Sequence, residues 1–285
     1  MISLLTHGLN WTQNLFLSGV AVIKCALLSK WPSPTPPVSS NELVILGNGP
    51  SLNLTLQEDI DYLESRDLMG VNLFACSEAF QKLKPSYYIW LDPAFAEEEH
   101  PAGQKARTAL KEHTNWPLTL LVPMTFKKSP AFQFFSNHPY IQVHYFNYVI
   151  CEGLPKFKWT LFRWGLGMPQ CQNVLIAAIF QSIQLGFKKI WITGADHTWH
   201  EDIRLNEANE LQVFDTHFYE KEKNITQMFT SMYAHRSYLS AAFLSLHKVY
   251  RGYEVLAAYA ASRSVLIQNA SKKSYIDVFP KKSLS

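Results

Sequence analysis

Cysteine is scarce in this sequence of 285 residues, and the spacing of the few cysteines excludes the common cysteine motifs. The four cysteines stand at positions 25, 76, 151 and 171 and form no C-x-x-C pair, so neither a zinc knuckle nor a thioredoxin-like motif is present. Four cysteines in a chain of this length do not predict a disulfide framework either. The sequence therefore favours a reduced, cytoplasmic compartment.

Charge is also sparse. Charged residues make up 17% of the chain, and the net charge of +3 is too small to predict a nucleic acid partner. The hydrophobic share of 47% excludes wholesale disorder, and 12 glycines with 15 prolines exclude a collagen-like or low-complexity chain. The length allows two domains or one large α/β domain. The mild basic bias suits an anionic small substrate and a membrane surface equally well.

The sequence lacks an uninterrupted apolar run that would make a clear membrane-spanning helix. Residues 9–31 come nearest, but Lys24 interrupts them and polar residues dilute their start. The basic region and cleavage site of a signal peptide are missing as well. Two interpretations stay open for this amphipathic helix. It packs on the body of the protein, or it holds the protein peripherally on the inner face of a membrane, with Trp11 and Trp31 near its ends.

A proline-rich stretch separates this helix from the remaining sequence. Four prolines between positions 32 and 37 cannot continue a helix and predict a stiff, extended linker. We therefore expect an N-terminal helix with its linker over residues 1–40. A single catalytic domain is expected over residues 41–285.

Apolar runs alternate with helical patterns along the main domain, which predicts an α/β, Rossmann-like, doubly wound and mostly parallel sheet. Strands are expected at 41–46, 68–75, 87–91, 118–123, 141–146, 190–193 and 254–258. Helices are expected at 54–65, 173–185 and 234–250, and the polar stretch 197–227 is expected to be a long loop or lid. Ligands of such sheets bind outside the carboxyl ends of the strands.

The sequence G-N-G-P-S at 47–51 follows the first expected strand. Its two glycines allow a ligand to approach the backbone closely, and the following helix would offer unpaired N–H groups to a phosphate. The Gly-Lys-Ser/Thr ending of a P-loop is absent, and Leu52 replaces the third glycine of a dinucleotide fingerprint. We favour a phosphate or nucleotide loop over a simple turn capped by Ser51.

Further polar residues stand where other strands are expected to end. Asn72 either caps a turn or binds a ligand, and Asp92, followed by a proline, either forms an Asx-turn or points into the crevice. The run Asp196-His197-x-x-His200-Glu201-Asp202 resembles a metal motif only superficially, because loop spacing fixes no common face. His235, at the start of an expected helix, is either a general base or a solvent-exposed histidine.

In this order, these features resemble the bacterial sialyltransferases of glycosyltransferase family 42 and the related flagellin-modification proteins. The resemblance covers about 43–270. It rests on V-I-L-G-N-G-P-S-L at 44–52, the Asn72 strand, Asp92-Pro93, L-G-F-K-K-I-W-I-T-G-A-D at 185–196 and the His235 helix. It implies a metal-independent, inverting transfer, in surface glycan synthesis, from a CMP-linked donor carrying sialic acid or a related acidic sugar. No cofactor is implied beyond that donor substrate.

The resemblance also implies roles for individual residues. Asn48, Gly49 and Asn72 would hold the donor nucleotide, and Ser51 would contact its phosphate. His235 would remove the proton from the hydroxyl of a glycan or glycolipid acceptor, while the stretch 197–227 would close over the donor.

At four positions aligned with the family's donor site, this sequence carries a different residue. Gln172 and Asn173 stand where the family has a serine or glycine, and Asp92 replaces an asparagine. Thr198, two residues after Asp196, replaces a tyrosine that assists the departing phosphate, for which Tyr219 or Tyr233 are the available substitutes. We keep all of these, with Asp196, as expected donor-binding residues.

Two other functions remain open. The archaeal 6-hydroxymethylpterin diphosphokinases look similar in the same glycine-loop and G-x-D segments, and that function needs magnesium, with Asp92 and Asp196 as candidate ligands. The third function is a nucleotide-binding module without catalysis.

Overall fold

The computed structural model describes residues 2–215, 218, 224–226 and 238–284. Its centre is a seven-stranded sheet with the order β10-β6-β1-β2-β3-β4-β5, in which every neighbouring pair is parallel. The strands are β1 Glu42–Leu46, β2 Asp67–Val71, β3 Tyr87–Ile89, β4 Leu118–Pro123, β5 Ile141–Phe146, β6 Lys189–Thr193 and β10 Leu266–Asn269. The expected doubly wound parallel sheet is confirmed.

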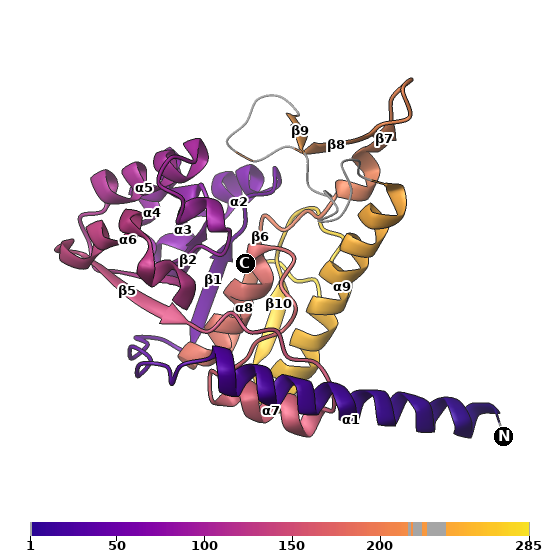
Figure 1. The fold of residues 1–285 in the computed structure, drawn as a ribbon. Helices are drawn as coiled ribbons and strands as arrows, with labels where there is room; N and C mark the ends of the chain where they lie inside the picture. The colour runs from indigo at the N-terminus through magenta and orange to yellow at the C-terminus, as the bar shows by residue number, and fades with distance from the viewer. Residues whose placement is uncertain (1, 216–217, 219–223, 227–237, 285) are drawn as a thin grey trace.

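Helices cover both faces of this sheet (Figure 1). The α-helices are α1 Ile2–Leu28, α2 Leu52–Glu58, α3 Ile60–Glu64, α4 Glu78–Leu83, α5 Pro101–His113, α6 Pro130–Gln133, α7 Pro155–Arg163, α8 Val174–Leu185 and α9 Leu239–Ser262. Short 3₁₀ helices span Phe74–Cys76, Pro93–Phe95, Met124–Lys128, Phe134–Asn137 and Trp199–Asp202.

Alternate residues of β1 serve two separate hydrophobic cores. Leu43 and Ile45 belong to the core beneath α1, α7, α8 and α9. Val44 and Leu46 belong to the core that contains residues of α2 to α6. Both faces of β1 are thus buried, which explains why its sequence is a continuous apolar run rather than an alternating one.

The order of the strands places a switch point beside β1. The chain moves from β1 through β2, β3, β4 and β5 in one direction, and then returns to place β6 on the other side of β1. In such sheets the crevice at the carboxyl ends of the two central strands is the usual ligand site. The glycine loop after β1 and Gly194 after β6 lie at this point.

The last predicted strand differs from the structure at the C-terminal end. Residues 254–258 are not a strand but part of α9, and the last strand is β10. A short apolar run does not distinguish a strand from a buried helix. In α9, Tyr253, Leu256 and Ala260 are buried at helical spacing, so this segment packs on the core as a helix.

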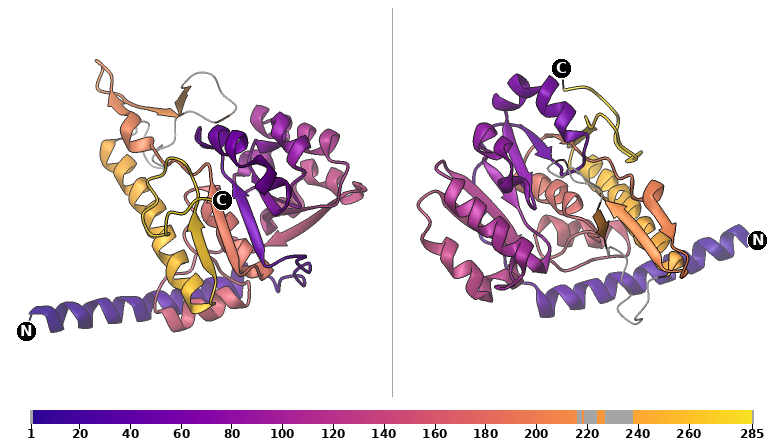
Figure 2. Two further views of the ribbon diagram at one scale, coloured as in Figure 1. Left: turned by 180° about the vertical axis from the view of Figure 1, so that it is seen from behind. Right: turned by 90° about the horizontal axis from the view of Figure 1, so that it is seen from above.

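The stretch expected as a lid contains regular structure. Within it, β7 Ile203–Leu205, β8 Leu211–Asp215 and β9 Asn224–Thr226 form an antiparallel sheet. This sheet extends beyond the carboxyl ends of the central strands (Figures 1 and 2). Val213 anchors it by packing on Ala242 and Leu246 of α9.

The expected helix over 54–65 is divided into α2 and α3 at Asp59. The φ and ψ of Asp59, −119° and 20°, are not helical, and its carboxylate pairs with Lys272 at 2.8 Å. The second strand is also shorter than expected, because the chain turns into the 3₁₀ helix Phe74–Cys76 after Val71.

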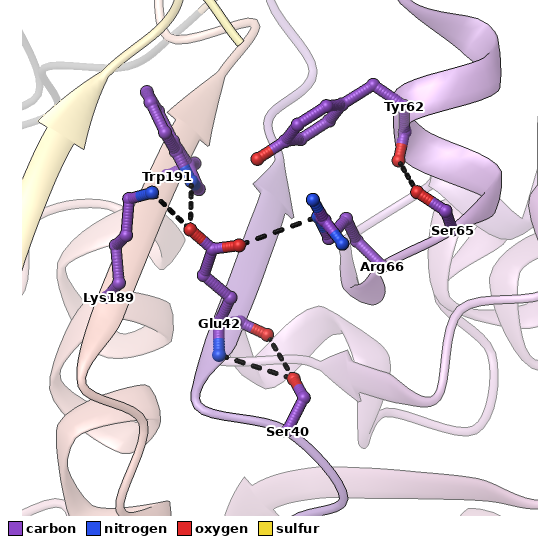
Figure 3. A network of polar contacts seen from close by, with 7 residues as sticks. All are labelled: Ser40, Glu42, Tyr62, Ser65, Arg66, Lys189 and Trp191. Carbon is purple, nitrogen blue, oxygen red and sulfur yellow. Dashed lines mark hydrogen bonds and ion pairs between the residues drawn. The ribbon is translucent and has the colours of Figure 1, made fainter. Parts of the chain in front are cut away.

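An ionic cluster holds the opposite, amino-terminal ends of the strands (Figure 3). The Glu42 carboxylate at the start of β1 accepts from Lys189 of β6, pairs with Arg66 at 3.5 Å and accepts from Trp191 Nε1 at 3.4 Å. The hydrogen bond from Lys189 is the main reason why the pKa of Glu42 is lowered. This cluster ties β1, β6 and the turn before β2 together, away from the switch point.

Helix α1 lies beside α7, and its N-terminal part extends past the body of the molecule (Figures 1 and 2). Among the described residues, one helical stretch, Leu9–Leu28, is long and apolar enough to cross a membrane. Despite the proline-rich stretch, α1 contacts the body directly, and Ala21 and Cys25 belong to a hydrophobic core.

Candidate functional site

A cavity of about 490 Å³ opens at the switch point of the sheet. Most of the residues expected from the sequence to bind the donor line it: Asn48, Gly49, Asn72, Asp92, Gln172, Asn173, Asp196 and Thr198. They come from the carboxyl ends of β1, β2, β3 and β6 and from the amino-terminal end of α8. Parallel strands bring these distant sequence positions to one edge.

The glycine loop lies directly against the end of β6. Gly47 N–H donates to Thr193 O at 2.9 Å, and Gly49 N–H donates to Gly194 O at 2.8 Å. A Cβ atom on Gly47 would lie 2.5 Å from Gly194 O, and one on Gly49 would lie 2.5 Å from Asp196 Oδ1. The two glycines are therefore required for the loops after β1 and β6 to approach each other.

Asp196 fastens this loop. Its carboxylate accepts a hydrogen bond from Ser51 N–H at 2.9 Å and another from the Ser51 hydroxyl. Both residues are about 5% exposed, and Ser51 does not line the cavity. The serine expected to contact a phosphate thus binds a carboxylate of its own chain, so Ser51 supports the cavity wall through Asp196, which lines it.

Asn48 and Asn72 carry buried amide groups without a hydrogen-bond partner. Both amide atoms of Asn48, Nδ2 and Oδ1, and the Oδ1 of Asn72 have none in the part of the chain that the structure describes. Burying such groups unpaired costs free energy, commonly about 1–3 kcal/mol for each group. Two asparagines of this kind on one cavity therefore indicate a ligand that would complete their hydrogen bonds.

The backbone holds Asn72 firmly in place. Its φ of 48° lies in the left-handed region, which asparagine tolerates better than most residues. Its carbonyl oxygen accepts from Tyr88 Oη at 2.8 Å and from Trp90 Nε1 at 2.9 Å. The side chain is thus held at the end of β2 while its own amide oxygen stays without a partner.

Asp92 forms an Asx-turn at the rim of the cavity. Its Oδ1 accepts from Ala94 N–H at 2.9 Å and caps the 3₁₀ helix that begins at Pro93. The side chain is exposed. The sequence left two interpretations open for Asp92, an Asx-turn or a carboxylate in the crevice. The structure contains the Asx-turn, and Asp92 also borders the cavity.

The amino-terminal end of α8 points to the cavity and is capped by Asn173. Asn173 Oδ1 accepts from Ile176 N–H at 3.1 Å, which fixes the orientation of the amide. Asn173 Nδ2 therefore donates, at 3.2 Å in each case, to His197 Nε2 and to Tyr253 Oη. Tyr253 Oη lies 2.7 Å from His197 Nε2 and donates to it.

This network determines the state of His197. Because its Nε2 accepts hydrogen bonds, the proton of the neutral ring lies on Nδ1. Burial lowers the pKa of His197 to about 3, so the ring is neutral near pH 7. The lone pair that a general base would need is already used, and His197 is a positioning residue at the wall of the cavity.

His200 lies apart from this network. Its ring packs edge-on against Tyr275 at 4.3 Å, and the neighbouring Glu201 pairs with Lys273 at 2.9 Å. No set of three or more His, Cys, Asp or Glu side chains suited to a metal ion occurs among the described residues. His235, Tyr219 and Tyr233 lie outside the described residues.

Two tyrosines of the site were not predicted from the sequence. Tyr253 of α9 closes the network behind His197, and Tyr148 lines the cavity and donates to Cys171 O at 3.1 Å. Burial raises the pKa of Tyr148 to about 12. No local motif surrounds either residue, because both reach the site only through tertiary packing.

A second cavity, of about 800 Å³, lies along the edge strand β5 and contains none of the expected site residues. Its wall includes Lys127, His138 and Tyr145. Within the described parts of the chain, none of its lining residues carries an unsatisfied buried polar side-chain atom. The smaller cavity at the switch point is therefore the better candidate site.

Comparison with known proteins identifies the fold. No family model matches the sequence, and no curated protein sequence matches it. Among solved structures, the MAf glycosyltransferase from Magnetospirillum magneticum AMB-1 is similar, with a TM-score of 0.52 and 11% identity. The match covers 95% of this chain and 38% of that chain, so this chain spans less than half of that protein. At this identity the similarity concerns the fold.

Proposed function

We propose that this protein is a glycosyltransferase that binds a nucleotide-activated sugar in the cavity at the switch point. The observation that carries the proposal is a set of buried amide atoms on one cavity wall, Nδ2 and Oδ1 of Asn48 and Oδ1 of Asn72, that have no hydrogen-bond partner among the described residues. The fold shared with a glycosyltransferase supports it. The resemblance in the sequence motifs points in the same direction and makes a CMP-linked acidic sugar the proposed donor.

The chemistry of the cavity suits such a donor. Amide groups both donate and accept, as the edge of a cytosine and the hydroxyls of a ribose require. The first N–H groups of α8 have no partner within a helix and carry partial positive charge, so they suit the donor phosphate. The side chains of Gln172 and Thr198 border the same space and would add hydrogen bonds to the donor.

The proposed reaction is one inverting displacement. A base removes the proton of the acceptor hydroxyl, its oxygen bonds to the anomeric carbon, and the bond from that carbon to the CMP phosphate breaks. Hydrogen-bond donors at the leaving phosphate stabilise the charge that develops there. His235 is the proposed base, and the acceptor is proposed to be a glycan or glycolipid.

A thermal-shift panel tests the donor class. CMP, CDP, UDP, GDP and ATP are compared, each with EDTA and with magnesium. CMP at 100 times its Kd is expected to stabilise the protein by about 2.7 kcal/mol with or without magnesium. Stabilisation by ATP only with magnesium would instead favour the diphosphokinase function.

The engagement of Asp196 weighs against that second function. A magnesium site built on Asp92 and Asp196 would need the Asp196 carboxylate, which already binds the Ser51 N–H and hydroxyl. Asp92 is likewise held by Ala94 N–H. We therefore propose that donor binding and transfer need no metal.

The base is tested by alanine variants of His235 and His200 and by His197→Asn. Loss of a general base lowers turnover by roughly 10²–10⁴-fold, and we expect this for His235→Ala with little change in donor affinity. His200 and His197 variants serve as the comparison. Near wild-type turnover in His235→Ala would remove the assignment, and a collapse confined to His200→Ala would move the base there.

A further inference from the structure

Helix α1 is amphipathic in the reverse sense to a helix of a water-soluble protein. The residues on its inner stripe, Asn14, Ser18, Ala21 and Cys25, are polar or small and follow one another at intervals of four, three and four. Ser18, Ala21 and Cys25 are at most 3% exposed. The stripe that packs most tightly on the body of the protein therefore consists of small or polar side chains, and Leu17 and Val20 beside it line a cavity between α1 and the body.

The outer face of α1 carries large apolar side chains that are exposed. Leu9, Phe16, Ile23 and Leu27 are separated by seven, seven and four residues, which aligns them along the side opposite the inner stripe. They are 68%, 71%, 60% and 78% exposed. We call these four residues the α1 outer face. In water this face would be unfavourable, since apolar surface of this extent normally marks an interaction site.

The contacts of the inner stripe hold α1 parallel to the surface of the body. Ser18 Oγ accepts from Leu154 N–H at 2.9 Å, and Lys24 Nζ donates to Ile150 O at 3.0 Å. Gly153, with φ of 106°, lets the loop after β5 approach the helix, because a Cβ there would lie 2.4 Å from Ser18 Oγ. A helix docked in this way has one side on protein and one side open along its length.

Charge indicates what covers the open side. Residues 1–41 contain no Asp or Glu, and α7, which lies beside α1, carries Lys156, Lys158 and Arg163 without an acidic residue. Lys30, Lys156 and Arg163 are exposed, and so is the acidic residue Glu152, three positions before α7. An anionic surface complements this set of cations.

Tryptophans mark the same surface. Trp31, just after α1, is 75% exposed and lies 6.4 Å, centroid to centroid, from the ring of Trp164, which is 52% exposed. Indole rings concentrate at the boundary between lipid headgroups and acyl chains.

We infer that the α1 outer face is the contact surface for an anionic phospholipid membrane, on which α1 lies in the plane of the interface. The helix does not span the bilayer in this arrangement. Residues 14–29 are held on the body, and spanning would carry Glu152 and Lys156 toward the hydrocarbon. This inference does not depend on the proposed glycosyl transfer.

A small cavity on the inner side of α1 adjoins the candidate site. A cavity of about 340 Å³ between α1 and the body is lined by Leu17, Ala21, Lys24, Ile150 and Gln170. Gln170 Nε2 donates to Gln172 Oε1 at 3.2 Å, and Gln172 lines the candidate site. The two cavities are therefore neighbours across the segment 170–172.

Vesicle flotation of the full chain tests the inference. We expect the protein to float with vesicles of phosphatidylcholine and phosphatidylglycerol, and less with phosphatidylcholine alone or in high salt. The variant Phe16→Ser/Ile23→Ser/Leu27→Ser is expected to bind at least about 100-fold more weakly. Its folding is checked by thermal unfolding, since all three side chains are exposed.

Two further variants separate apolar area from charge. Phe243→Ser/Leu244→Ser removes two apolar side chains of α9 that are 55% and 54% exposed, and it is expected to bind like the wild type. Lys30→Gln/Lys156→Gln is expected to lose roughly fivefold in affinity for each cation, for anionic vesicles only.

Three results would overturn the inference. Wild-type protein that floats with neither vesicle type would do so. Equal losses in the α1 and α9 variants would also do so, because binding would then not be specific to the α1 outer face. A vesicle-independent dimer in light scattering that the α1 variant dissolves would show that a second copy covers this face.

Discussion

At the scale of single residues, the buried amides of Asn48 and Asn72 dominate the candidate site. The buried amide atoms Asn48 Nδ2, Asn48 Oδ1 and Asn72 Oδ1 have no hydrogen-bond partner among the described residues, which is unfavourable for the fold and favours a ligand that pairs them. Such a buried amide lowers the stability of the free protein and strengthens the binding of a ligand, so a variant that removes it separates the two effects.

We predict that Asn48→Ala and Asn72→Gly each weaken nucleotide binding about tenfold, while the free protein stays as stable or becomes slightly more stable. Glycine is chosen for Asn72 because its φ of 48° would strain alanine. Titration calorimetry and thermal unfolding measure the two quantities. Thr55→Val, which removes a buried unpartnered hydroxyl outside the cavity, is the control and is expected to bind nucleotide normally.

A second prediction concerns His197 and acid. Its folded-state pKa of about 3 lies below the ordinary 6.5, so the unfolded chain binds the proton first as the pH falls. The stability that neutral His197 contributes is complete above pH 6.5 and is lost toward pH 3, by at most about 1.4 kcal/mol per pH unit. The unfolding free energy of wild type should therefore fall more steeply than that of His197→Asn. Parallel curves would contradict the burial of the ring.

The sequence identified most residues of this cavity, because polar residues at the ends of parallel strands must meet at one edge. It did not identify the bond between Asp196 and Ser51, whose partners are 145 residues apart. The expected contact of Ser51 with a phosphate followed from local helix geometry alone. The carboxylate from β6 already occupies that position, and only the folded chain brings it there.

At the scale of elements, the two loops after β1 and β6 form one unit. We predict that Gly49→Ala destabilises the protein by about 1–3 kcal/mol and abolishes nucleotide binding, because its Cβ would overlap Asp196 Oδ1 and Gly194 O. Gly19→Ala in α1 meets nothing within 4 Å and should be neutral or stabilising by up to about 1 kcal/mol. Urea unfolding compares the two. Equal stability would mean that the loops do not touch.

Elements with a repeating apolar pattern were predictable, and elements defined by their neighbours were not. Strands β4 and β5 have the expected bounds, because β4 is a mostly apolar run and β5 is rich in apolar and aromatic residues. The antiparallel strands β7 and β8 lie within a stretch of polar sequence, and Val213 of β8 packs on Ala242 and Leu246 of α9. Residues 254–258 were predicted as a strand and are part of α9, because the packing of α9 on the core determines how far the helix extends.

At the scale of the whole molecule, α1 joins the body through contacts that the linker does not prevent. Asn147 Oδ1 accepts from Lys30 N–H at 2.9 Å, and the Sγ atoms of Cys25 and Cys151 lie 3.3 Å apart. A hydrogen bond from Cys151 lowers the pKa of Cys25 to about 7. The expected separation of residues 1–40 from the main domain is thus a separation in sequence more than in space.

We predict that deleting residues 1–40 leaves a folded, soluble protein that is less stable by about 2–4 kcal/mol, since several buried contacts are lost. Deleting residues 1–8 retains the inner stripe and should leave the stability unchanged. Urea unfolding of both proteins measures the difference. An unchanged midpoint in the longer deletion would show that α1 contributes nothing to the fold.

The reversed amphipathicity of α1 has a consequence for how this segment tolerates sequence drift. In an ordinary surface helix the large apolar positions are intolerant and the polar ones vary freely. Here the fold requires smallness at Ser18 and Ala21, where Gly153 and the loop after β5 press against the helix, and places no demand on Phe16 or Ile23. Folding and the inferred membrane contact therefore select on opposite sides of one helix. A chain that no longer needed to bind a membrane would keep the small residues of the inner stripe and lose the large apolar residues of the α1 outer face.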